Sequence, residues 1–137
     1  MGTLGRAWQK PRGLAFDVLP ALLYFALLFW AGLIPLKSLP GPDFELSDKV
    51  WHLLAFGGLA GLLSRALTYF GRPALAAARD AALVATALGG LLEVLQSLTA
   101  YRSADWADFL ADSIGTALAY AVLRGLHAAA TSQKGLA

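Results

Sequence analysis

The chain has 137 residues, of which 58% are hydrophobic and only 15% are charged, and its formal net charge is +2. Soluble domains have roughly 45–50% apolar and about 25% charged residues, so this composition favours a membrane protein. The small net charge, without a dense basic run, argues against nucleic acid as a partner. The sequence has no cysteine, which excludes disulfides and cysteine-ligated metals.

The first predicted element is a transmembrane helix over residues 14–36. Residues 18–36 carry no charged side chain and are long enough to cross about 30 Å of hydrocarbon as a helix. Three basic residues precede this run, a layout that also suits a secretory signal peptide. Signal peptides have a shorter apolar core of about 7–15 residues and end at a small-residue cleavage site. The longer run, closing on Pro35, favours a retained helix.

Three more transmembrane helices are predicted further along the chain. Ser47 is a candidate N-cap for the second helix, and Gly71 and Pro73 mark its end. The tail after the last helix is expected to fray. The predicted fold is an all-α membrane protein, a bundle of four transmembrane helices forming one domain over residues 1–137. The three further helices are expected at about residues 48–69, 81–100 and 104–126.

The distribution of Lys and Arg predicts the orientation of the bundle. Eight of the 11 basic residues lie at the N-terminus, in the segment Arg65–Arg79 around the end of the second helix, and at the C-terminal end. Cytoplasmic segments are enriched in Lys and Arg, so both termini are predicted to be cytoplasmic. Trp51, Tyr101 and Trp106 then fall at the outer boundary, where aromatic belts occur.

Several polar side chains lie within or beside the apolar runs. A charge at the bilayer centre costs about 2.5–3.5 kcal/mol on insertion scales, so these residues call for a shared explanation. Helices two and four start outside and helix three ends there, which predicts one extracytoplasmic layer for all of them. The residues are Asp48, Lys49, His52, Glu93, Gln96, Arg102, Asp105, Asp108 and Asp112.

Helical spacing places these side chains on shared faces. Asp48 and His52 are four residues apart, and Glu93 and Gln96 are three apart. The three aspartates of the fourth helix form a similar stripe. Gly57 lies five residues after His52, so the histidine and glycine stripes are expected to face different neighbours. The polar faces are predicted to converge on a cavity open to the outside.

Simpler interpretations exist for some of these residues. Asp48 and Asp105 also suit the first turn of a helix, where the helix dipole favours an acid. Lys49 also suits a boundary position from which its ammonium group reaches water. Asp17 and His127 are expected to be solvated charges at the cytoplasmic boundary.

The ordered set of polar residues resembles the VanZ-like family of small bacterial membrane proteins. The resemblance covers about residues 47–124 and implies a multi-pass protein of the bacterial inner (cytoplasmic) membrane. The family's namesake is associated with low-level resistance to the antibiotic teicoplanin, but nothing in this sequence points to teicoplanin itself. The matching motifs are Asp48-Lys49-x-x-His52, Glu93-x-x-Gln96, Arg102, Asp105, Asp108 and Asp112-x-x-Gly115.

The first functional hypothesis is a cell-envelope protein that binds or acts on a lipid-linked or cell-wall-related substrate. Glu93 or Asp112 would act as the base, with His52 as proton partner or ligand. Arg102 would clamp an anionic head group. The same residues could hold a divalent cation, but no metal or cofactor is identified. The expected substrate-binding residues are Asp48, Lys49, Gln96, Arg102, Asp105 and Asp108.

Two alternatives stay open. In a scaffolding protein, the polar layer would be a satisfied network that fixes helix packing. A small homodimeric transporter would also carry buried carboxylates. The transporter hypothesis is weakened by the charge-free first helix and by a polar layer away from the midplane, where transport sites lie. A homo-oligomer is compatible with all three hypotheses.

Overall fold

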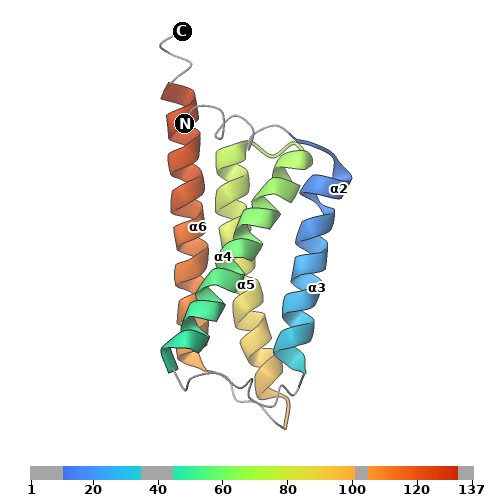
Figure 1. Ribbon diagram of the computed structural model, residues 1–137, viewed down its shortest axis with the longest axis vertical. Helices are drawn as coiled ribbons and strands as arrows, with labels where there is room; N and C mark the ends of the chain where they lie inside the picture. The colour runs from blue at the N-terminus through green and yellow to red at the C-terminus, as the bar shows by residue number, and fades with distance from the viewer. Residues whose placement is uncertain (1–10, 35–44, 101–104, 133–137) are drawn as a thin grey trace.

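The computed structural model describes residues 11–34, 45–100 and 105–132. Within these ranges all regular structure is helical, and four spans are long and apolar enough to cross a membrane (Figure 1). The prediction of an all-α protein with four candidate transmembrane spans is confirmed. The side of the membrane on which the termini lie stays a prediction. The elements are α2 (Leu14–Asp17), α3 (Leu19–Leu33), α4 (Glu45–Tyr69), α5 (Ala74–Ser97) and α6 (Trp106–Ser132).

The first span consists of two helical pieces, α2 and α3, that meet at Val18. Pro20 stands in the first turn of α3. Proline has no N–H to donate to the preceding turn and is well accommodated in the first turn of a helix. The helix is therefore interrupted at Val18 and begins again as α3. The two pieces together form the span Leu14–Leu33.

The turn between α4 and α5 is a Schellman-type cap. The backbone N–H of Arg72 donates to the Leu67 carbonyl and that of Gly71 to the Thr68 carbonyl, both at 3.0 Å. Gly71 has φ of 86°, in the left-handed region where glycine is unstrained. The end of α4 therefore lies where the glycine predicted it.

Several helix boundaries differ from the predictions. Helix α4 begins at Glu45 rather than near residue 48, so Ser47 lies inside the helix and is not its N-cap. The two largest differences are at the start of α5 and the end of α6. Helix α5 begins at Ala74 rather than near residue 81, and α6 continues to Ser132 rather than ending near residue 126. Both extensions are rich in alanine, the strongest helix former, although a charged or polar side chain interrupts the apolar pattern. In α5 the interruption is Arg79 next to Asp80, and these two side chains hydrogen-bond to each other.

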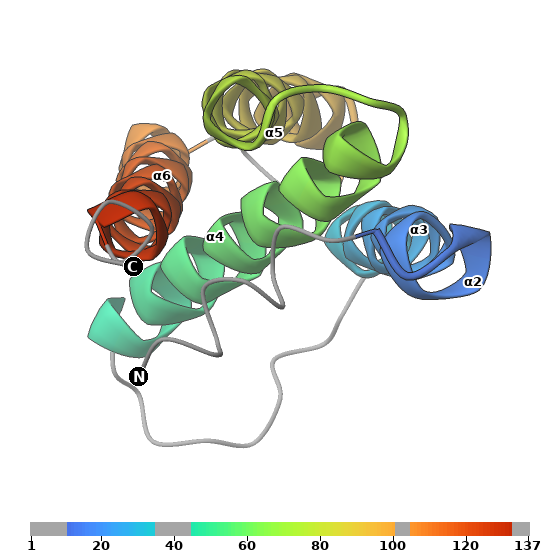
Figure 2. The same ribbon diagram turned by 90° about the horizontal axis from the view of Figure 1, so that it is seen from above.

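Helix α4 is the central element of the bundle. Viewed from above, it runs diagonally between α3 and α6, with α5 along a third side (Figure 2). It contacts all three of these helices. Buried side chains from α4 and α5 form the main apolar core, namely Phe56, Leu59, Ala60, Ala85 and Leu92. Many large apolar side chains point outward instead, as expected for surfaces that face lipid.

Helices α4 and α6 approach each other most closely at glycine. A Cβ atom on Gly115 would lie 2.1 Å from the Leu53 carbonyl oxygen, and one on Gly57 would lie 3.0 Å from the Gly115 carbonyl oxygen. Small residues permit such backbone contact between membrane helices. His52 also faces α6, so the prediction that His52 and Gly57 face different helices is wrong. The reason is that the α4 backbone at Leu53, between them, itself lies against α6.

At the opposite end of the bundle, Asp17 and Arg65 form a buried ion pair. Asp17 is only 1% exposed, and its second carboxylate oxygen accepts hydrogen bonds from the backbone N–H groups of Arg12 and Gly13. The expectation that Asp17 is a solvated charge is therefore wrong. The carboxylate instead joins the start of α2 to α4.

Candidate functional site

Six polar side chains from α4, α5 and α6 gather at one end of the bundle. The first turns of α4 and α6 and the last turns of α5 lie together at the lower end in Figure 1. The six residues, here named the polar cluster, are Lys49, His52, Glu93, Asp105, Asp108 and Asp112. The structure thus brings into contact three segments that the sequence placed in one layer.

Lys49 lies at the mouth of the polar cluster, between Asp105, which directly precedes α6, and Asp108 of α6. Its ammonium group is 2.7 Å from a carboxylate oxygen of Asp105 and also bonds Asp108. Asp105 precedes the membrane-spanning part of α6. The hydrogen bond from Lys49, followed by one from the backbone N–H of Ala107, lowers the pKa of the Asp105 carboxyl below its ordinary value. Lys49 therefore binds carboxylates across the helix interface rather than only reaching for water.

His52 and Asp112 form the deeper part of the polar cluster. Nδ1 of His52 is 3.0 Å from Oδ1 of Asp112, and its Nε2 is 3.7 Å from Oδ2 of Asp108. Asp112 is fully buried. Its Oδ2 lies so close to α5 that a Cβ atom on Gly89 would be 2.7 Å away. Glycine at position 89 is thus what gives this carboxylate room.

Glu93 links α5 to the start of α6. Its Oε2 accepts a hydrogen bond of 2.8 Å from the backbone N–H of Asp105, the residue that caps α6. Asp105 in turn accepts the N–H of Ala107 through its side chain, as an N-cap does. Glu93 is only 6% exposed. Its Oε1 and the Oδ2 of Asp112 are buried and have no hydrogen-bond partner among the described residues.

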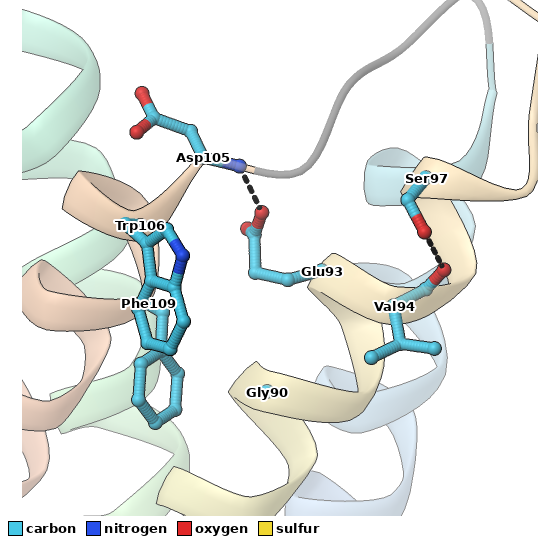
Figure 3. A pocket seen from close by; sticks show the side chains of 7 residues that line it. All are labelled: Gly90, Glu93, Val94, Ser97, Asp105, Trp106 and Phe109. Carbon is cyan, nitrogen blue, oxygen red and sulfur yellow. Dashed lines mark hydrogen bonds between the residues drawn. The ribbon is translucent and has the colours of Figure 1, made fainter.

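A cavity of about 290 Å³ lies beside Glu93, between α5 and α6 (Figure 3). Trp106 and Phe109 form its aromatic wall, with ring centroids 6.0 Å apart, and Gly90 provides room on the opposite side. The predictions assigned Trp106 to an aromatic belt and did not single out Phe109. Their spacing of three residues placed both on one face, but the α5 wall is formed only in the tertiary structure. The lining residues are Gly90, Glu93, Val94, Ser97, Asp105, Trp106 and Phe109.

Three further residues were predicted to belong to the site but are not members of the polar cluster as defined here. Gln96 is buried and donates a 3.0 Å hydrogen bond to the carbonyl of Gly32 on α3, so its contact is with the first span. Asp48 is exposed at the start of α4. Arg102 lies outside the described residues, and its role as an anion clamp stays a prediction.

Two groups of three side chains have the spacing of metal ligands, with the ligand atoms of each group within 4.8 Å of one another. The first comprises Asp48, His52 and Asp108, of which Asp48 is exposed and Asp108 already pairs with Lys49. The second comprises His52, Glu93 and Asp112. In this group the two acidic residues are buried.

Comparison with known proteins assigns the family. A family model described as VanZ/LLP1 matches residues 23–127, which include most of α3, all of α4 and α5, and every member of the polar cluster. Neither the curated proteins nor the solved structures gave a match. Since the matched range covers well over half of the chain, the protein belongs to the VanZ/LLP1 family.

Proposed function

We propose that this multi-pass protein lies in the bacterial inner membrane and binds a lipid-linked, anionic substrate of the cell envelope. The observation that carries the proposal is the position of Glu93. This residue belongs to the polar cluster and also lines the cavity between α5 and α6. A ligand with an apolar chain and a charged head would meet both environments at this point.

The cavity suits the apolar part of such a ligand. Its walls include two aromatic rings and Val94, and ligand sites combine mostly apolar linings with few polar groups. Trp106 is 83% exposed on the outer surface of the bundle, where a lipid chain would approach. The apolar chain would therefore enter from the bilayer, between α5 and α6.

The mouth of the polar cluster suits the charged head. Lys49 already holds two carboxylates, so an incoming phosphate or carboxylate would compete with Asp105 and Asp108 for its ammonium group. Arg102 would add a second cation, because guanidinium groups bind such anions in a bidentate manner.

A chemical step on the bound substrate is part of the same proposal. Glu93 or Asp112 would act as the general base, and His52 would exchange a proton with Asp112 across their 3.0 Å contact. Hydrogen-bond reach between such groups is the first requirement for acid–base work.

The test uses full-length protein in detergent and native mass spectrometry with a polyprenyl phosphate as probe. We expect the wild type to retain polyprenyl phosphate in preference to phosphatidylcholine. In Gly90→Leu the new side chain would fill the cavity, so retention should fall at least about tenfold, which corresponds to a loss of 1.4 kcal/mol. Gly125→Leu is the matched control, because a Cβ atom there would meet no atom within 4 Å.

Two results would contradict lipid binding. One is a wild type that does not distinguish the two lipids, and the other is a folded Gly90→Leu variant that binds as the wild type does. Either result would favour the scaffolding alternative, in which the polar cluster only fixes helix packing.

A further inference from the structure

We propose that His52, Glu93 and Asp112 bind one divalent transition-metal ion, such as Zn²⁺ or Mn²⁺, at the buried end of the polar cluster. This inference goes beyond the proposed function, because it assigns a ligand to the protein itself and does not depend on a lipid substrate. A bound ion would replace the proton contact of His52 and Asp112, so it is independent of the proposed lipid binding but not of the proposed acid–base step. It rests on geometry, on unpartnered oxygens and on the local charge.

The geometry matches three ligands of one ion. Two ligands about 2.1 Å from a common ion stand about 3.4 Å apart in tetrahedral geometry and about 3.0 Å apart at the right angles of octahedral coordination. The Nδ1 atom of His52 and the Oδ1 atom of Asp112 have this separation, 3.0 Å. An oxygen of Glu93 completes the group, with all three ligand atoms within 4.8 Å of one another. Small side-chain rotations would bring all three to bonding distance.

The unpartnered oxygens point independently to a ligand. Oε1 of Glu93 and Oδ2 of Asp112 are buried and accept no hydrogen bond from the described residues. Both residues are more than nine-tenths buried. A buried carboxylate oxygen without a partner is costly, and buried charges are usually paired or coordinate metals. A cation between the two carboxylates would satisfy both oxygens.

The local charge favours a cation over an anion at this depth. Among the described residues of this layer, one lysine and one histidine face five carboxylates, and the lysine binds the two at the mouth. The ammonium group therefore does not serve Glu93 or Asp112. The five acids are Asp48, Glu93, Asp105, Asp108 and Asp112.

The ligand types select the class of metal. Carboxylates alone suit Mg²⁺ or Ca²⁺, whereas an imidazole ligand suits Zn²⁺ and other transition metals. Three protein ligands leave a coordination position open, as in catalytic zinc sites.

The experiment measures metal bound to full-length protein. Purified protein is stripped with EDTA, titrated with Zn²⁺ or Mn²⁺, desalted and assayed by elemental mass spectrometry. We expect saturation near one ion per chain in the wild type. Asp112→Asn and His52→Gln should each weaken binding at least about tenfold, because each removes a ligand. Asp80→Asn is the matched control, since Asp80 pairs with Arg72 and Arg79 at the other end of the bundle.

Several outcomes would overturn the metal site. If the wild-type protein does not take up metal in a saturable manner, the metal site is excluded, whatever the variants do. The metal site is also excluded if the Asp112→Asn variant is folded and takes up as much metal as the wild type. Circular dichroism and gel filtration would check its folding. Equal binding of Mg²⁺ by the wild type and by His52→Gln would contradict the transition-metal assignment.

The metal and lipid proposals can fail separately. Gly90→Leu changes the cavity but none of the three ligands, so it should bind metal as the wild type does. Retained metal binding with no preference for polyprenyl phosphate would contradict the proposed function alone. Retained lipid binding after EDTA treatment, without metal uptake, would contradict the metal site alone.

Discussion

At the residue scale, the least expected feature is the ion pair of Asp17 and Arg65. Both side chains are more than nine-tenths buried, and their positions are 48 residues apart in the sequence. Buried ion pairs are costly to disrupt from one side, since the remaining charge is left in a low-dielectric environment. This pair therefore holds the first span, through α2, to the central helix α4.

Replacing one partner of this pair should destabilise the protein strongly. For Arg65→Met we expect the free energy of unfolding to fall by about 3–5 kcal/mol, because Asp17 loses its buried counter-ion. Reversible unfolding in mixed micelles would measure the change. Arg124→Met is the control, since Arg124 is exposed on α6. If the double variant Asp17→Asn with Arg65→Met were no more stable than Arg65→Met alone, the charge argument would be wrong.

At the element scale, the site depends on how closely α4 and α6 approach. The contact of Gly115 with the Leu53 backbone lies one turn from Asp112 on α6 and one residue from His52 on α4. The glycine contact therefore fixes the separation across which the 3.0 Å contact of His52 and Asp112 forms. The backbone packing and the polar chemistry belong to the same helix interface.

A methyl group at position 115 should separate the two helices. In Gly115→Ala the new Cβ atom would lie 2.1 Å from the Leu53 carbonyl oxygen, and a backbone atom cannot rotate away. We expect a clearly lower thermal midpoint for the purified protein. Gly125→Ala, which adds a methyl group in open space, should unfold at or above the wild-type midpoint, because alanine is the better helix former. Equal midpoints for the two variants would refute the close-packing argument.

At the scale of the whole molecule, the two ends of the bundle differ in charge. The four carboxylates of the polar cluster and the nearby Asp48 lie at one end, whereas Arg12, Arg65, Arg72 and Arg79 lie towards the other. The start of α2 and the end of α6 are both at the basic end (Figure 1). Because cytoplasmic segments are rich in Lys and Arg, this arrangement supports cytoplasmic termini and an outward-facing polar cluster.

Cysteine labelling can test this orientation directly, since the chain contains no native cysteine. A cysteine at Gly41 should react with an impermeant reagent applied to intact spheroplasts. A cysteine at Phe70, an exposed residue between α4 and α5, should react only after permeabilisation. A reporter fused after Ala137 should be active in the cytoplasm. The reverse labelling pattern would place the polar cluster on the cytoplasmic side.

Much of the fold was predictable because hydrocarbon imposes strong constraints on sequence. Four apolar runs and the glycine turn at Gly71 predicted the spans, since a membrane helix must satisfy its own backbone hydrogen bonds. The predicted start of α5 was wrong because two charged residues, Arg79 and Asp80, interrupt the apolar run and were taken to lie before the helix. These side chains hydrogen-bond to each other and are tolerated in the first turns of α5.

The candidate site was predictable as a layer but not as a set of contacts. Helical period and span direction placed His52, Glu93 and Asp112 at one depth, because both are properties of single helices. They did not reveal that Gln96 bonds Gly32, that Asp17 pairs with Arg65, or that a cavity lies beside Glu93.

The sequence by itself therefore determined the membrane class, the number of spans and the depth of the polar layer. Only the tertiary structure decided which side chains meet. The crossing of α4 over α6, set by backbone contact at Gly115, brings His52 to Asp112, while α5 brings Glu93 to the start of α6. The physical reason is that hydropathy and helical period act along one helix, whereas the rotation and crossing of helices depend on packing between them.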